Sequence, residues 1–234
     1  MIFNKNWFIK KINRGMAELN KRQEMREQFK HAIDVAKYYH SSREYNYEEK
    51  SIILNYIMNT IKIDMQSEYI VDLFYHSDAK EIPRDHFPLE YYDENGNKHE
   101  LISGEPQMRL VSLKDDYVIT FPWNVDRIKD NILNITKNGF RYFSNNHFAY
   151  YYSEVDLCIV CNGNHSIASG IYNKDGTIQA KVVDIAPLFQ HVSTDGAYFF
   201  NRHTNEIVGG LQDFRIAILF EIAKMKYNII EPEW

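Results

Sequence analysis

Over the first third of the chain, hydrophobic residues recur with the spacing of an α-helix. Phe29, Ile33 and Ala36 follow i, i+4, i+7 spacing within a segment that contains no Gly or Pro. Similar stripes of apolar residues recur up to residue 75. The pattern predicts helices over residues 16–40, 47–63 and 67–75, and residues 1–77 are therefore expected to form a helical region.

The hydrophobic pattern is interrupted after residue 77. Proline and glycine recur through the next thirty residues, at Pro83, Pro88, Gly96, Gly104 and Pro106. The stretch Asp93-Glu94-Asn95-Gly96 has the composition of a tight turn, and short apolar segments flank it at 89–92 and 99–102. We expect residues 78–107 to be a linker or a hairpin arm.

From residue 108 onward, short alternating segments mix with helical ones. The pattern predicts strands at 108–113, 118–121, 147–152, 155–161 and 178–185, and helices at 125–136, 166–172 and 211–227. Residues 108–234 are expected to form one α/β domain. The predicted fold class is α+β, with an N-terminal helical region followed by a mixed sheet with packed helices.

The strand predicted at 155–161 is apolar along its whole length, which is typical of a fully buried strand. Alternation places Leu157, Ile159 and Cys161 on one face and Cys158 and Val160 on the other. The strand itself therefore separates the two sulfurs, and the chain contains no second cysteine pair for a zinc site. We expect two reduced, buried thiols.

A short polar loop, Asn162-Gly163-Asn164-His165-Ser166, joins this strand to the next helix. The first backbone N–H groups of a helix have no partners within it, and with the helix dipole they favour an anion such as phosphate. Gly163 would let the backbone turn sharply, and Ser166 is a candidate N-cap. His165 could contact a phosphate or act as an acid or base. The alternative is a well-formed turn with a structural histidine.

The segment from about Phe121 to Leu188 resembles the ParB/sulfiredoxin-like (ParB-like nuclease) family. The likeness rests on a Pro122 entry, a helix ending at Asn138-Gly139, two strands, the Asn162–Ser166 loop, and a helix with small residues before a further strand. It covers about 30% of the chain. It implies a ParB/sulfiredoxin-like mixed sheet.

The resemblance also implies a function at the loop. Residues Asn162, Gly163, Asn164, His165 and Ser166 would bind nucleotide phosphate, with His165 as a catalytic residue of a phosphotransferase or nuclease. A nucleoside triphosphate with Mg²⁺ would be the cofactor. The chain departs from the pattern, because Asn162 replaces a frequent Asp, Ser166 replaces an Arg, and Asn164 stands where sulfiredoxins have cysteine.

These departures support a second hypothesis, a non-catalytic interaction protein that keeps the fold without the chemistry. Such proteins serve in mobile-element, phage-defence or toxin–immunity systems, and a protein partner would then be expected. Arg127, Arg141 and Lys181 are candidates to supply the missing positive charge.

Charge and composition limit the other possibilities. The net charge of −5, from 27 basic and 32 acidic residues, disfavours non-specific nucleic-acid binding. No apolar stretch reaches the roughly 20 residues that span a bilayer, so we expect a cytoplasmic protein. His147, His165, His191 and His203 follow no metal-ligand spacing, and no metal site is expected.

Overall fold

The computed structural model describes residues 5–76 and 86–230, with side chains described from residue 13 to residue 228. Two long helices open the fold, α1 (Lys5–Ser41) and α2 (Tyr47–Tyr75). The second begins with a reciprocal cap: the Asn46 side chain accepts from the Glu49 backbone N–H, and the Glu49 side chain accepts from that of Asn46. The expected N-terminal helices are confirmed within the described residues 5–76.

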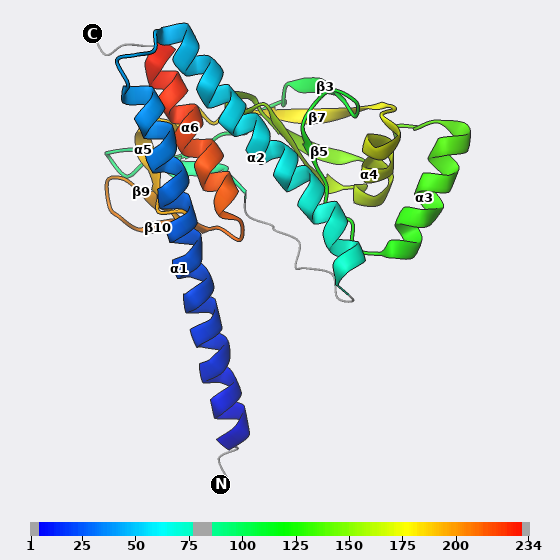
Figure 1. Cartoon of the computed structure of the whole chain (residues 1–234), viewed down its shortest axis with the longest axis horizontal. Helices are drawn as coiled ribbons and strands as arrows, with labels where there is room; N and C mark the ends of the chain where they lie inside the picture. The colour runs from blue at the N-terminus through cyan, green and yellow to red at the C-terminus, as the bar shows by residue number, and fades with distance from the viewer. Residues whose placement is uncertain (1–4, 77–85, 231–234) are drawn as a thin grey trace.

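The prediction of two helices between residues 47 and 75 was wrong, because α2 is continuous. Residues 64–66 contain no helix breaker, and Met65 is buried among other apolar residues. The apolar face therefore passes through the expected gap without interruption. The long α2 reaches from the helical side of the molecule to the edge of the main sheet (Figure 1).

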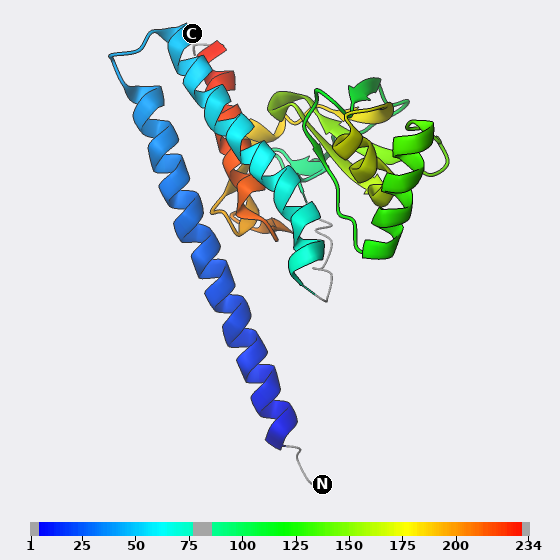
Figure 2. The same ribbon diagram turned by 45° about the vertical axis from the view of Figure 1, so that its right-hand side comes forward.

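Helix α1 contacts the rest of the protein over only part of its length. Its buried residues, Met25, Ile33 and Ala36, belong to its C-terminal two-thirds. Figures 1 and 2 show its N-terminal end projecting well away from the other elements. No helix in the described part of the chain is both long and apolar enough to cross a membrane.

Helix α6 (Phe214–Ile230) packs against both α1 and α2. The sequence predicts a single apolar stripe, but the helix is buried on most of its circumference from residue 216 to residue 223. The reason is its position: α1 and α2 lie beside it, and side chains from the sheets join the same apolar cluster. A helix surrounded in this way is apolar nearly all round.

The main sheet has five strands in the order β3-β7-β5-β6-β4 and is mixed. Strand β5 runs parallel to β7 and antiparallel to β6, β3 is antiparallel to β7, and β4 is parallel to β6. The strands are β3 (Met108–Ser112), β4 (Val118–Ile119), β5 (Phe148–Tyr152), β6 (Leu157–Asn162) and β7 (Thr177–Val183). An α+β fold with a mixed sheet is therefore confirmed.

Strand β6 divides the interior into two apolar clusters. Leu157 and Ile159 join the larger cluster with α1, α2 and α6, whereas Cys158 and Val160 join a smaller one with α4 (Asn164–Asn173). The predicted alternation of faces is confirmed. Both cysteines are free thiols, but Cys161 is exposed because it lies where β6 leaves the core, so the prediction of two buried thiols was wrong for it.

A buried lysine ties α2 to the start of β6. The Lys62 ammonium donates to the carbonyl oxygens of Val155 (3.0 Å) and Asp156 (3.3 Å) and lies over the Tyr117 ring. Burial lowers the pKa of Lys62 to about 8. The helix and the start of the strand are thus joined by hydrogen bonds from a buried ammonium group.

Of the two alternatives for residues 78–107, a linker or a hairpin arm, the hairpin is present. Strands β1 (Glu90–Tyr92) and β2 (Lys98–Glu100) pair antiparallel around the predicted turn. Residues 77–85, of which 78–85 belong to the predicted linker or hairpin arm, lie outside the described residues. Buried Phe87 attaches the start of the hairpin to the large apolar cluster.

A small C-terminal sheet was not predicted. After α5 (Leu188–His191), strands β8 (Val192–Thr194), β9 (Tyr198–Asn201) and β10 (Ile207–Gly210) form an antiparallel sheet in the order β10-β9-β8. The strands have only three or four residues each, and β10 ends in two glycines, so the segment shows no clear strand periodicity.

An ionic network joins α2 to the start of α6. Arg215 is buried, and its guanidinium contacts the carboxylates of Asp213 (2.8 Å), Asp64 (2.6 Å) and Glu68 (2.5 Å). The Tyr69 hydroxyl donates to Asp213 at 2.7 Å, and burial together with this carboxylate raises the pKa of Tyr69. These contacts hold two helices that are distant in sequence.

Candidate functional site

The predicted loop lies where β6 passes into α4 (Asn164–Asn173). The helix begins two residues earlier than expected, and its N-cap is Gly163, with φ +84° and ψ 18°. The prediction of Ser166 as N-cap was therefore wrong. Ser166 lies in the first turn, and its hydroxyl donates back to the Gly163 carbonyl at 3.0 Å.

Gly163 is required here for two reasons. Its φ lies in the left-handed region, which side-chain-bearing residues adopt at a cost. A Cβ at this position would also stand 2.5 Å from Cδ2 of His147 and 3.2 Å from the Asn146 carbonyl oxygen. The loop thus passes so close to the preceding segment that only glycine fits.

The start of α4 offers unused hydrogen-bond donors. The first bond of the helix runs from the Ile167 N–H to the Gly163 carbonyl. Within the described residues, the backbone N–H groups of Asn164, His165 and Ser166 donate to no other protein group. These three donors, at the positive end of the helix dipole, favour an anion.

Two of the predicted site residues also hold the preceding chain in place. Buried Asn164 accepts from the Phe121 N–H at 2.8 Å. Nε2 of His165 accepts from the backbone N–H groups of Trp123 (3.3 Å) and Asn124 (3.1 Å). Because Nε2 is an acceptor in both bonds, His165 is neutral and carries its proton on Nδ1. Burial and the charge of Arg127 lower its pKa.

His147, which the sequence analysis did not assign to the loop, is part of the same site. Its Nδ1 accepts from the Phe143 N–H at 3.1 Å, and its Nε2 lies 2.9 Å from the Ser166 hydroxyl. Nε2 must then carry the proton, so the order of donation is His147 to Ser166 to Gly163. This polarity is opposite to that of a histidine activating a serine nucleophile.

Opposite tautomers are therefore expected for these two histidines. Nitrogen-15 NMR at pH 7 should show His147 protonated on Nε2 and His165 on Nδ1, each with a pKa below the ordinary 6.5 because burial disfavours the charged ring. Since the unfolded chain would take up protons first, the stability that the neutral rings contribute is present above about pH 6.5 and is lost as the pH falls below it. A histidine that titrates above 6.5 would contradict this assignment.

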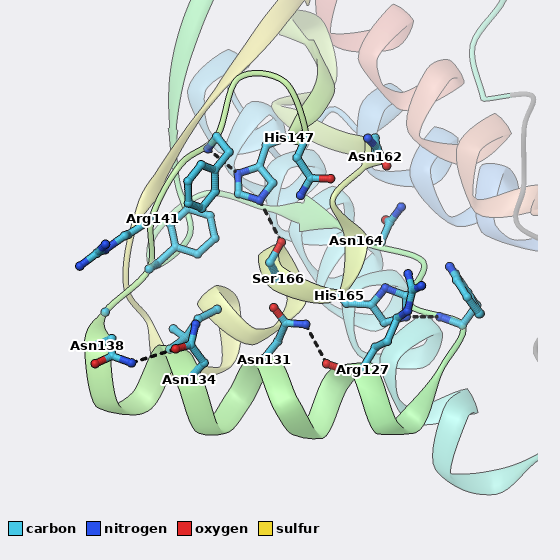
Figure 3. Close-up of a pocket in the computed structure, with 16 residues that line it drawn as sticks. Arg127, Asn131, Asn134, Asn138, Arg141, His147, Asn162, Asn164, His165 and Ser166 are labelled. Carbon is cyan, nitrogen blue, oxygen red and sulfur yellow. Dashed lines mark hydrogen bonds between the residues drawn. The ribbon is translucent and has the colours of Figure 1, made fainter.

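A cavity of about 670 Å³ opens between this loop and α3 (Val125–Asn138). Figure 3 shows the polar side chains that surround it, from α3, from the loop after α3 and from the start of α4, with Arg141 at its outer edge. Its polar lining consists of Arg127, Arg141, His147, His165, Ser166 and six asparagines, Asn131, Asn134, Asn138, Asn146, Asn162 and Asn164. The described lining residues include no Asp or Glu.

The two arginines lie on opposite sides of this cavity (Figure 3). The Arg127 guanidinium stacks over the Trp123 ring, 4.8 Å from its centroid. Arg141 is exposed in the loop that follows α3. Lys181, the third candidate cation, instead lies over the Phe148 ring on the sheet and does not line the cavity.

One polar face of α3 was missed in the sequence. Arg127, Asn131, Asn134 and Asn138 follow i, i+4, i+7, i+11 spacing, which places them on one side of the helix. Ile128 and Ile135 are buried on the neighbouring face, and Ile135 also reaches the cavity. An asparagine stripe beside an isoleucine stripe was the available signal for a binding surface.

The four histidines considered as a metal cluster do not come together. His147 and His165 line the cavity, whereas His191 and His203 face each other on the C-terminal sheet. The absence of acidic groups among the described lining residues leaves the cavity poorly suited to hold a divalent cation by itself, since Mg²⁺ and Ca²⁺ prefer carboxylate oxygens.

Comparison with known proteins identifies one family. A family model described as a family of unknown function, DUF6710, matches residues 14–232. Neither a curated protein nor a solved structure matches significantly. The match covers α2, α3, α4 and α6, all three described sheets and most of α1, so the cavity and its loop fall within it. The chain belongs to the DUF6710 family.

Proposed function

We propose that the cavity between α3 and the start of α4 binds a phosphate-bearing ligand, with a nucleotide as the best candidate. The observation that carries this proposal is the combination of three free backbone N–H groups with a lining that has two arginines and, among its described residues, no carboxylate. In a chain with a net charge of −5, such a surface is locally positive.

The size and polarity of the cavity suit a nucleotide. A volume of about 670 Å³ falls in the ordinary range for small-molecule sites. Asparagine side chains offer both donors and acceptors, which suit a base or a ribose. Trp123 and Phe143 add aromatic surface on which a base can stack.

The resemblance to the ParB/sulfiredoxin-like family supports the same proposal. The segment runs in the order expected: a proline entry, α3 ending at Gly139, strands β5 and β6, the loop, α4 and β7. The loop at the end of β6 is where that family would bind nucleotide phosphate. A ParB-like identity is therefore part of the proposal.

Binding without turnover is favoured over catalysis. His165 uses Nε2 to accept from two amides, so protonating that nitrogen requires breaking both bonds. Ser166 receives a proton from His147 and is not activated by it. With no carboxylate among the described lining residues, Mg²⁺ would enter only with the ligand's phosphates.

Calorimetric titration with inorganic phosphate, ATP, CTP and GTP tests the proposal. We expect saturable binding of at least one nucleotide with or without Mg²⁺, and Arg127→Ala should weaken it by roughly tenfold or more because a charge-assisted hydrogen bond is lost. Lys137→Ala is the matched control: it removes an exposed positive charge from the same helix, outside the cavity. It should leave the affinity unchanged.

Two outcomes would count against the proposal. Equal losses in Arg127→Ala and Lys137→Ala would indicate non-specific attraction to α3. No binding of any of the four ligands, together with a stoichiometric protein partner recovered from the native host, would favour the non-catalytic interaction protein. Substitution of His165 is a poor probe, since it would also leave the amides of Trp123 and Asn124 without an acceptor.

A further inference from the structure

A second group of polar residues lies away from the cavity, where the β1–β2 hairpin meets the C-terminal sheet. Glu94 belongs to the hairpin turn, His191 is the last residue of α5, and His203 lies in the turn between β9 and β10. One ligand atom from each, two imidazole nitrogens and a carboxylate oxygen, lie within 4.8 Å of one another. The hairpin turn and two segments of the C-terminal region therefore converge on one point.

The two imidazoles face each other through their ring nitrogens. Nδ1 of His191 and Nε2 of His203 are 3.0 Å apart, and the ring planes are inclined at 49°. Two histidines bound to one tetrahedral Zn²⁺, with Zn–N of about 2.0–2.1 Å, hold their nitrogens about 3.3 Å apart. The observed pair is close to that arrangement.

The backbone that carries the two histidines is itself held in place. The Arg202 N–H donates to the His191 carbonyl at 2.9 Å, and the Arg202 guanidinium donates to the carbonyls of Phe189 and Gln190. The Asn201 side chain accepts from the His203 N–H at 2.7 Å. These hydrogen bonds fix the main chain that carries the two rings, and a metal site requires ligands held in place in this way.

The hairpin is positioned on the same point by aromatic contacts. Tyr91 stacks on His191, with ring centroids 4.7 Å apart, and on His99 at 5.0 Å. Asp93 accepts from the N–H groups of Asn95 and Asn97, which shapes the turn that carries Glu94. The Glu94 side chain is exposed, so its carboxylate can rotate toward the two nitrogens.

We propose that Glu94, His191 and His203 bind a divalent transition-metal ion, with Zn²⁺ as the best fit. Two imidazoles and one carboxylate match the ligands that Zn²⁺ takes, whereas Ca²⁺ and Mg²⁺ prefer oxygen alone. Solvent exposure leaves a fourth position for water. The bound ion fastens the hairpin to the C-terminal sheet.

Titration of the metal-free, untagged full chain with Zn²⁺ tests this site. One equivalent should bind and raise the midpoint of thermal unfolding, because the ion binds the folded chain. His203→Ala should weaken binding by at least about tenfold. Loss of a residue that only hydrogen-bonds to a metal ligand already weakens metal binding by about 10–100-fold, and His203 is itself a ligand. Glu94→Gln is a second variant that keeps both histidines, and it should weaken binding in the same direction.

Controls separate this site from other zinc-binding groups. His31→Ala removes an exposed histidine of α1, and Cys161→Ser removes the exposed thiol, so both should bind Zn²⁺ as the unaltered chain does. Unchanged affinity in His203→Ala would overturn the proposal, as would the absence of saturable binding. Equal affinity for Mg²⁺ would overturn the assignment to a transition metal.

Discussion

Replacing Arg215 by methionine is expected to lower the free energy of unfolding by about 3–5 kcal/mol, the cost typical of breaking a buried ion pair from one side. The loss should appear in urea denaturation at pH 7 as a lower midpoint with an unchanged slope. Its cause is the buried Asp213 carboxylate, which would keep the Tyr69 hydroxyl as a partner but lose the guanidinium.

The geometry makes Arg215 difficult to replace. Three carboxylates surround its guanidinium, and two of them, Asp64 and Glu68, belong to α2. Without the positive charge these carboxylates repel one another across the contact between α2 and α6. Methionine fills a similar volume, so the measured loss reports the charge more than a cavity.

Two further variants test whether the lost stability comes from an unpaired buried charge. Lys30→Met removes one partner of the exposed pair Lys30–Asp34 and should leave stability almost unchanged. Combining Arg215→Met with Asp213→Leu should recover part of the loss, because no buried charge then remains unpaired. A single Arg215→Met variant as stable as the unaltered chain would show that the network contributes little.

Gly163→Ala should both destabilise the fold and abolish ligand binding at the cavity. A φ of +84° costs a non-glycine residue about 1–2 kcal/mol, and the contact of its Cβ with His147 adds about 1–3 kcal/mol of overpacking. We expect a total loss of about 2–5 kcal/mol in urea denaturation. Displacing His147 would also disturb Ser166 and the free N–H groups of α4.

Gly104→Ala is the matched control for the cost of placing a side chain on a left-handed backbone. Gly104 also has a left-handed φ, +74°, but a Cβ there meets no atom within 4 Å. It should cost only about 1–2 kcal/mol and leave nucleotide binding intact. Equal losses of unfolding free energy in the two variants would mean that His147 moves aside at no cost. The close contact between Gly163 and His147 would then contribute nothing to stability.

Periodicity predicted the elements whose apolar faces are regular. Ile128 and Ile135 mark one face of α3, and Leu157 and Ile159 alternate with Cys158 and Val160 along β6; both patterns agree with the observed burial. Each face of these elements packs against one kind of neighbour. The local spacing of apolar residues is therefore enough to predict the helix or the strand.

The C-terminal sheet escaped prediction for the opposite reason. Strands β8 to β10 are three or four residues long, which is too short for alternation to stand out. Their pairing is set by turn contacts, such as the Asn201 side chain accepting from the His203 N–H, and by tertiary contacts, such as the ion pair between Arg26 and Asp195. Such contacts leave no periodic trace in the sequence.

The candidate site was predicted only in part. The strand–loop–helix order indicated the loop, but the roles of His165 and Asn164 depend on amides of residues 121–124, more than forty positions away. His147 and the asparagine face of α3 join the loop only through folding. Side chains that serve distant backbone groups are not recognisable from local sequence.

The packing of α1 against α6 has a consequence for folding during synthesis. Residues of α1 bond directly to the segment before α6, as in the Arg22 guanidinium bonds to the carbonyls of Ala197 and Leu211. The large apolar cluster therefore cannot close until nearly the last described helix has left the ribosome. Until then the apolar surfaces of α1 and α2 that α6 covers stay exposed, which favours aggregation of the unfinished chain.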